Sequence, residues 1–489
     1  MTPRRLAAVA LLACVLAGCA ARPVNPPIER ADPLTGYRYL TSARLANPPE
    51  DLVLLAFSGG GTRAASFSFG VLEALRTIEV TAPDGGKSRL LDSVSAITGV
   101  SGGSFTALAY GLYGEKLFDE YETRFLKRDI EGTLISRLFD PTYWGPLSST
   151  GWGRSELAAD YYDEILFDGA TYADLMKRPG PIIVANATDL ASGGRFYFSQ
   201  TVFDIICSDL SAVRLSRAAA TSSAVPLVLS PVTYNNYGGS CGYEQPAWLK
   251  PVLAARPEPR SAARVGREMR DLAAYGDSKA RPYLHLVDGG VADNLAMRGV
   301  LDILDEIEAR RLLGEPTPLD KIRRIVVFVV NSMSRPKLDW DQSVSAPGPI
   351  EILLQVTGVP IDHYSYDAVE RLLDTAARWR IYRAMREAAA PADRARPAFI
   401  EVMRAPDAEI FVVDVSFADL PDAAEREYLN QLPTSFVLPG EAVDRLRSAA
   451  IEILRTSPGF RDYLNELKAR GYRVSWPARP AGGAPSGVE

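Results

Sequence analysis

Apolar runs rich in β-branched residues alternate with segments of helical periodicity along most of this chain. Strands are predicted at residues 52–57, 93–98, 181–187, 283–287, 325–330 and 410–417. Helices are predicted between them, at residues 63–78, 104–113, 294–313 and 367–388. Because the strands are almost continuously apolar, both faces of their sheet are expected to be buried. The predicted fold class is therefore α/β, a three-layer αβα arrangement around a mostly parallel central sheet.

One long, aromatic-rich stretch, residues 113–180, interrupts this alternation and is too long for a bare connection. We interpret it as a helical insertion that serves as a lid or an acyl-chain channel; ordinary packing of helices on the sheet is the alternative for most of its aromatics. The insertion lies within a main domain at residues 51–335. An α/β extension with helices, residues 336–473, is expected to pack on that domain, followed by a disordered tail at residues 474–489.

The amino terminus has the pattern of a secretory signal. Arg4 and Arg5 precede an apolar run, residues 6–15, that is too short to span a bilayer. The tetrad Leu16-Ala17-Gly18-Cys19 resembles the bacterial lipoprotein cleavage box, in which the cysteine is acylated. We therefore predict a signal peptide at residues 1–18, lipidation of Cys19 and a Pro-rich tether at residues 19–50. An ordinary signal peptide is the alternative.

The net charge of the chain limits the classes of partner that it is expected to bind. The full chain has a net charge of −6, and removal of residues 1–18 with their two arginines makes it −8. An acidic body offers no basic surface for nucleic acid, so no nucleic-acid partner is expected. With Ala20, rather than Asp, after Cys19, the resemblance to bacterial lipoproteins favours the outer membrane, facing the periplasm.

Two further cysteines lie in the body of the chain, Cys207 and Cys241. If Cys19 carries a lipid in an oxidising compartment, these two remain as a candidate disulfide pair. Two buried free thiols are the alternative.

Three consecutive glycines, Gly59-Gly60-Gly61, stand between a predicted strand and a predicted helix. With Ala64 they satisfy the loose dinucleotide pattern G-x-G-x-x-A. That pattern also requires an acidic residue at the end of the next strand, whereas Glu79 lies at the end of the helix. No Gly-Lys-Ser/Thr follows, so a nucleoside triphosphate loop is excluded. What remains is a set of backbone amides at a helix start that can face negative charge.

The second motif is Gly99-Val100-Ser101-Gly102-Gly103, a G-x-S-x-G sequence between a predicted strand and a predicted helix. This is the context of a nucleophile elbow, where small neighbours allow a tight turn and close approach of a substrate carbonyl. Ser101 is therefore the candidate nucleophile.

A serine nucleophile needs a base, and the chain contains only two histidines, His285 and His363. His285 alternates with apolar neighbours in a strand-like run, and His363 is expected to lie in a loop. A Ser-His-Asp triad through either one stays open. The other candidate base is Asp288, at the end of a strand and before Gly289 and Gly290. Its ordinary alternative is a turn or helix-cap aspartate.

Taken in order, "SGGGTRA", "GVSGG" and "VDGG" resemble the patatin-like phospholipase family. The stretches "NATDLASGGRFYFSQ" (186–200) and "AAATSSAVPLVLSPV" (218–232) are also similar to it, and the resemblance covers roughly residues 50–340. The family loop often has Asp where this chain has Ser58, and Gly where it has Ala64. The residues to which the resemblance gives roles are Ser101 as nucleophile, Asp288 as base, Gly59, Gly60 and Gly61 as oxyanion hole, and Arg63, Gly99, Gly103, Gly289 and Gly290 as supporting positions.

The resemblance implies a serine lipid acyl hydrolase that needs no cofactor and no metal. Its expected partners are a membrane lipid or acyl-ester substrate, and the membrane itself through the N-terminal lipid. Two alternatives remain: a Ser-His-Asp esterase of soluble esters or peptidoglycan-linked acyl groups, and a non-catalytic lipid-binding lipoprotein of the envelope.

Overall fold

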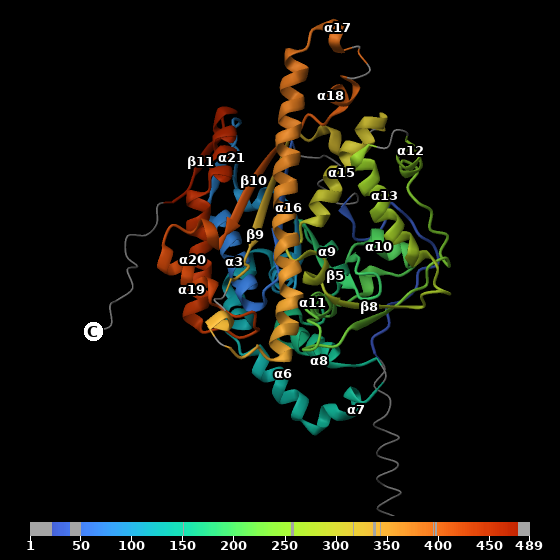
Figure 1. The fold of residues 1–489 in the computed structure, drawn as a ribbon, viewed down its shortest axis with the longest axis vertical. Helices are drawn as coiled ribbons and strands as arrows, with labels where there is room; N and C mark the ends of the chain where they lie inside the picture. Colours follow the sequence, from blue (N-terminus) through green and yellow to red (C-terminus); the bar gives the residue numbers. More distant parts are fainter. Residues whose placement is uncertain are drawn as a thin grey trace, which may run out of the picture.

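The computed structural model describes residues 22–39, 50–149, 151–255, 259–315, 317–335, 339–342, 344–394, 396 and 399–477. Figure 1 shows the fold and the element labels used below. The predicted signal peptide and Cys19 lie outside the described residues.

An eight-stranded sheet forms the centre of the part of the chain that the structure describes. In spatial order its strands are β10 (Glu409–Ser416), β9 (Arg324–Asn331), β1 (Asp51–Phe57), β4 (Val94–Val100), β5 (Ile182–Asp189), β8 (Tyr283–Asp288) and β7 (Val232–Asn235), with β6 (Arg195–Tyr197) paired to β5. The first five are parallel to one another, and β6, β7 and β8 pair antiparallel. All six predicted strands are present, and the mostly parallel sheet is confirmed.

Alternate residues of β1 belong to two separate cores. Val53, Leu55 and Phe57 join a cluster with residues of α3 (Gly61–Thr77), α4 (Gly102–Tyr113) and α20 (Gly440–Thr456). The even-numbered residues between them join a second cluster with α15 (Arg298–Leu313) and α16 (Pro349–Ala388). Because side chains alternate between the faces of a strand, helices cover both faces of the sheet. The three-layer αβα prediction therefore agrees with the structure.

The remaining helices and strands surround this central sheet or form a second, smaller sheet. The helices are α5 (Leu117–Tyr121), α6 (Ile130–Phe139), α7 (Trp144–Leu147), α8 (Arg154–Tyr162), α9 (Tyr172–Met176), α10 (Gln200–Ile205), α11 (Leu215–Ser222), α12 (Leu249–Ala254), α13 (Arg260–Ala273), α14 (Gly290–Asp293), α17 (Pro391–Arg394), α18 (Ile400–Arg404), α19 (Ala423–Asn430) and α21 (Pro458–Ala469). A small sheet contains β11 (Arg473–Ser475), β2 (Glu79–Thr81) and β3 (Lys87–Arg89). Among the described residues, no helix is both long and apolar enough to cross a membrane.

The four predicted helices are present with shifted bounds. The largest shift is in α16, which begins at Pro349, 18 residues before the predicted start, and contains Pro360. His363 therefore lies in a helix, and its placement in a loop is wrong. The predicted insertion is helical: its described residues form helices α5 to α9 and turns between them, without a strand.

Residues 22–39 correct the prediction of a free tether. Asn25 donates to Ser208 Oγ at 2.8 Å, Ile28 N donates to Cys207 O at 2.9 Å, and the buried Arg38 pairs with Asp204 at 2.8 Å. A Pro-rich composition predicts extended backbone, and extended backbone can also pack along a surface that offers it partners. This segment is therefore part of the folded body.

The C-terminal segment packs on the main domain, as predicted. It supplies β10, which extends the central sheet beside β9, and α20, which packs along α3. Through β10, this segment also becomes part of the central sheet. The predicted tail starts too early, because β11 ends at Ser475 and the Trp476 ring lies 5.8 Å from that of Phe460. Residues 478–489 lie outside the described residues.

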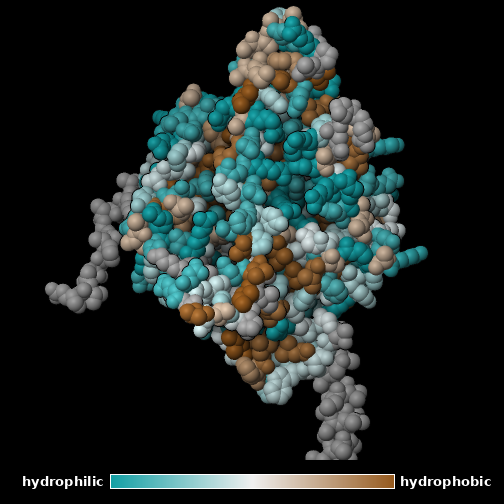
Figure 2. Space-filling view, in the orientation of Figure 1, coloured by the Kyte–Doolittle hydropathy of each residue, from teal (hydrophilic) through white to brown (hydrophobic). Residues whose placement is uncertain are grey.

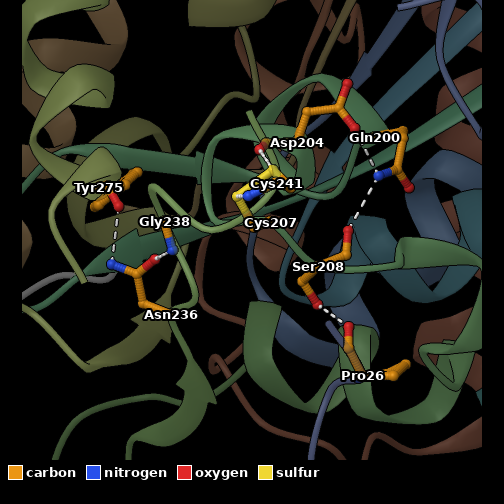
Figure 3. The surroundings of a disulfide bond; sticks show 9 residues. All are labelled: Pro26, Gln200, Asp204, Cys207, Ser208, Asn236, Gly238, Cys241 and Tyr275. Atoms are coloured by element: carbon orange, nitrogen blue, oxygen red, sulfur yellow. Dashed lines mark hydrogen bonds between the residues drawn. A yellow bond between two sulfur atoms is a disulfide. The ribbon is translucent and has the colours of Figure 1, made fainter. Parts of the chain in front are cut away.

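Cys207 and Cys241, the predicted pair, are joined by a disulfide with 5.5 Å between their Cα atoms. Figure 3 shows that it lies beside the site where the N-terminal segment packs, with Ser208 donating to Pro26 O at 2.8 Å. The bond therefore lies beneath the packed N-terminal segment.

Candidate active site

The serine elbow has the backbone that its sequence predicts. β4 ends at Val100, α4 begins at Gly102, and Ser101 between them has φ 49° and ψ −123°. A non-glycine residue in this region is strained, and strained serines of this kind occur at nucleophile elbows. A Cβ atom at Gly99 would lie 2.8 Å from Ser104 N, and one at Gly103 would lie 2.6 Å from Phe57 O. Both glycines are therefore required by close backbone packing.

The glycine loop lies directly against this elbow. A Cβ atom at Gly102 would lie 1.9 Å from Gly61 O, and one at Gly59 would lie 3.4 Å from the Ser101 Cβ. Gly60 and Gly61 have φ values of 138° and 59°, which favour glycine. The loop thus brings the start of α3 next to the hydroxyl of Ser101.

The three predicted oxyanion donors differ in whether their backbone amides are already hydrogen-bonded. Gly59 N donates to Asn294 O at 2.9 Å, so this amide is occupied and its prediction as a donor is wrong. Within the described residues, the amides of Gly60 and Gly61 have no hydrogen-bond acceptor. They stand at the amino end of a 17-residue helix, where the helix dipole favours negative charge. These two amides are the candidate oxyanion hole.

Asp288 reaches the elbow by a route that the sequence did not predict. β8 is antiparallel to β5, and on that strand it pairs only with residues 187–189. On the other edge of β5, Asn186 pairs with Val100, so β5 extends past the end of β4. The last residue of β8 therefore lies beside the end of β4.

The carboxylate of Asp288 contacts the nucleophile. The Ser101 side chain interacts with it and lowers its pKa, and Gly290 N donates a hydrogen bond to it at 2.7 Å. The two residues are almost fully buried, with exposed fractions of 4% for Ser101 and 7% for Asp288. Gly289 is required here, because a Cβ atom would lie 2.5 Å from Asn186 O.

Burial changes the acidity of this carboxylate. It raises the pKa of Asp288 from 3.8 to about 6, and the hydrogen bond from Gly290 N and the neighbouring Ser101 side chain offset part of this rise. A group with this pKa is ionised at neutral pH and still takes up a proton readily. Both properties are required of a general base.

Neither histidine takes part in the described contacts of the site. His285 is exposed on β8, with its Nδ1 3.0 Å from Thr233 Oγ1. His363 is exposed on α16. No described hydrogen bond joins either of them to Ser101 or Asp288, so the geometry favours the dyad over the triad.

Two supporting residues were missed by the sequence reasoning. Ser222, the last residue of α11, accepts from Ser101 N at 3.0 Å and donates to Asn186 O at 2.6 Å. The Asn186 amide group donates to Gly99 O at 2.9 Å. The signal that could have found Asn186 is a polar residue inside an apolar strand, whereas Ser222 lies among other hydroxyl residues and has no such signal. They hold both sides of the elbow.

Arg63 supports the glycine loop through hydrogen bonds to neighbouring oxygen atoms. It is buried and donates to Ser332 O at 2.8 Å, Leu432 O at 2.7 Å and Thr434 Oγ1 at 3.0 Å. Burial lowers its pKa to about 10. Thr62 N also donates to Ser435 O at 2.9 Å. The C-terminal segment therefore fixes the start of α3, beside the two free amides.

A family model described as patatin-like phospholipase matches residues 55–301, which is just over half of the chain and includes the loop, the elbow and Asp288. The chain belongs to the patatin-like phospholipase family. Patatin-like phospholipases are carboxylic ester hydrolases that act on lipids with a serine nucleophile.

The solved structures that are similar to this chain share little sequence identity with it. Human GIVD cytosolic phospholipase A2 is 15% identical, with a TM-score of 0.36, over 86% of this chain and 60% of that one. Its complex with methyl gamma-linolenyl fluorophosphonate is 13% identical, with a TM-score of 0.38, over 86% and 59%. VipD from Legionella pneumophila is 10% identical, with a TM-score of 0.30, over 94% and 74%. The chain thus spans about 60% of the length of the human enzyme. No curated protein matched.

Proposed function

We propose that this protein is a serine acyl hydrolase of membrane lipids, of phospholipase A or esterase type. Asp288 takes the proton from the Ser101 hydroxyl as its oxygen attacks the ester carbonyl. The resulting oxyanion is held by the amides of Gly60 and Gly61. Asp288 then returns the proton to the leaving alcohol, and an acyl-serine ester remains. The observation that supports this proposal is that the strained Ser101 of the elbow interacts with the buried carboxylate of Asp288.

The second half of the reaction uses the same groups. Asp288 accepts a proton from a water molecule, whose oxygen attacks the acyl-serine carbonyl. The tetrahedral intermediate then expels the serine oxygen, which regains a proton from Asp288, and the fatty acid is released. Removal of one oxyanion-hole donor commonly costs about 10² to 10³ in turnover, so the two free glycine amides are a major part of the proposed catalysis.

We also propose that the protein is held at the bacterial envelope by a lipid on Cys19, on the outer membrane and facing the periplasm. The support is the match of Leu16-Ala17-Gly18-Cys19 to the lipoprotein box after a short apolar run. A phospholipid-rich surface would then be the immediate surroundings of the enzyme.

A Ser101→Ala variant tests the activity. Wild-type protein is expected to release free fatty acid from phospholipid vesicles and from a short-chain soluble ester. The variant should lose at least roughly 10³-fold on both substrates, because no acyl-enzyme can form. Ser93→Ala, a change at a partly exposed serine just before β4, should keep wild-type rates. Equal rates for Ser101→Ala and wild type would rule out the proposed nucleophile.

A further inference from the structure

Helices α6 and α7 expose large apolar side chains. The exposed fractions are 48% for Ile135, 76% for Phe139 and 57% for Trp144. Figure 1 shows both helices at one end of the molecule, and Figure 2 shows a strongly hydrophobic surface at that end. A folded chain gains nothing by exposing such residues together, so contiguous patches of this kind mark contact sites.

A loop from the active site exposes two more apolar residues. Leu227 and Val228 have exposed fractions of 60% and 63%. The loop follows α11, which ends at Ser222, and near its start the carbonyl oxygen of Ala224 accepts a hydrogen bond from Asp288 N at 3.0 Å. Further along, Ser155 at the start of α8 donates hydrogen bonds to Ser230. The exposed loop therefore runs from the backbone of Asp288 to the start of α8.

The described N-terminal segment begins at the same place. The side chain of Arg22 packs on Gly151, in the α7–α8 connection, where a Cβ atom would lie 2.6 Å from the Arg22 Cδ. Cys19 precedes Arg22 by three residues, and three residues reach about 11 Å at most. A lipid on Cys19 would therefore hold this end of the molecule against the membrane, without a long tether.

We propose that the apolar face, defined as Ile135, Phe139, Trp144, Leu227 and Val228, docks on the surface of the lipid bilayer and inserts into it. This rests on the proposed function and adds a second, protein-borne contact to the lipid on Cys19. The face includes the loop that begins beside Asp288, so docking brings this loop to the membrane that holds the substrate.

The small number of charged residues in α6 and α7 supports a lipid surface as the occupant of the apolar face. Residues 130–147 contain only Glu131, Arg137 and Asp140 as charged residues, and Arg137 is paired with Glu164 at 2.6 Å. Binding therefore relies on burial of apolar area and not on anionic headgroups. Trp144, whose indole donates to Leu138 O at 3.1 Å, has the amphipathic ring that is enriched at membrane interfaces.

A local fluorescence probe tests the docking. The full-length chain is used with Ser101→Ala to prevent hydrolysis, and with Cys14→Ala and Cys19→Ser to remove free thiols. Acrylodan is attached at Ser136→Cys on α6 or, as a control, at Asn465→Cys on α21, which Figure 1 places at another end of the molecule. Vesicles of phosphatidylethanolamine and phosphatidylglycerol should shift the emission to shorter wavelength at position 136 only, and Phe139→Ser with Leu227→Ser should remove that shift.

Three results would overturn the proposal: no shift at position 136, an equal shift at position 465, or a shift at 136 that appears without vesicles as protein concentration rises. The last would identify a second copy as the occupant.

Rates of hydrolysis on vesicles and on a soluble ester distinguish a loss of membrane docking from a loss of catalysis. In the active chain, Phe139→Ser with Leu227→Ser should lower fatty-acid release from vesicles by about tenfold or more, the change that about 1.4 kcal/mol of lost binding produces. Turnover of a soluble short-chain ester should stay unchanged. An equal loss on both substrates would contradict docking by these residues. If the unmodified chain hydrolyses neither substrate, the proposed function fails, whereas the fluorescence result still decides the docking.

Discussion

An Asp288→Asn variant is expected to lose roughly 10³-fold or more of kcat toward a soluble ester while becoming more stable than the wild type. The amide cannot accept the proton of Ser101, so the general base is lost. Its oxygen can still accept the hydrogen bond from Gly290 N, so the fold around the site should remain intact. Turnover and thermal unfolding of the same preparations measure the two effects.

The gain in stability depends on pH in a defined direction. The folded-state pKa of Asp288 is about 6, above its ordinary value of 3.8, so the folded protein binds this proton more tightly than the unfolded chain. Stability therefore falls as pH rises from about 4 to 6, and above that range the buried charge costs about 3 kcal/mol at about 1.4 kcal/mol per pKa unit. The asparagine side chain carries no charge, so the variant should exceed the wild type at pH 8 and match it at pH 4. Wild-type turnover should decline below about pH 6, as the base takes up its proton.

Asp414 provides a matched control. It is largely buried on β10, at the opposite edge of the sheet, and burial raises its pKa to about 6 as well. Asp414→Asn should therefore give a similar gain in stability with wild-type turnover. Full activity in Asp288→Asn would show that another group acts as the base.

An Arg217→Met variant is expected to destabilise the protein by about 3 to 5 kcal/mol. Arg217 on α11 and Glu156 on α8 form a buried ion pair at 2.9 Å, and each side chain is only 4% exposed. Arg217 also donates to Thr233 O at 2.8 Å and lies over the ring of Tyr234 at 4.3 Å. Without it, the Glu156 carboxylate stays buried with no cation, which is the costly state. Urea unfolding followed by tryptophan fluorescence measures the loss.

Two further variants make this result specific. Lys177→Met removes a surface ion pair with Asp174, in which Lys177 is 71% exposed, and should cost less than about 1 kcal/mol. Adding Glu156→Gln to Arg217→Met removes the unpaired charge and should recover much of the loss. If Arg217→Met lowers the free energy of unfolding no more than Lys177→Met does, the result would contradict a stabilising buried ion pair between α8 and α11.

The sequence predicts the elements of this fold well where one physical rule dominates. The strands around Leu55 and Val327 are buried on both faces, so their composition alone identifies them. The elbow at Ser101 and the loop at Gly60 are also local in sequence, because each lies in a short glycine-rich turn between a strand and a helix. A local pattern is therefore sufficient to locate both motifs.

Other features depend on pairings between distant residues. β8 pairs antiparallel with the end of β5 that extends past β4, and no local pattern encodes this pairing. The occupied amide of Gly59 depends on Asn294, and the packing of the N-terminal segment depends on partners such as Asp204. The role of Ser222 as hydrogen-bond acceptor for Ser101 N could not be predicted for the same reason, because it depends on the contact between α11 and the elbow.

The most direct test of the account is the location of a covalent adduct with a fluorophosphonate, which reacts with activated serines. The full-length wild type and Asp288→Asn are incubated with the reagent, digested and mapped by mass spectrometry. The account predicts one adduct, on the peptide that contains Ser101, formed rapidly in the wild type and far more slowly in Asp288→Asn. An unmodified Ser101 peptide, or an adduct at equal rates in both proteins, would contradict it.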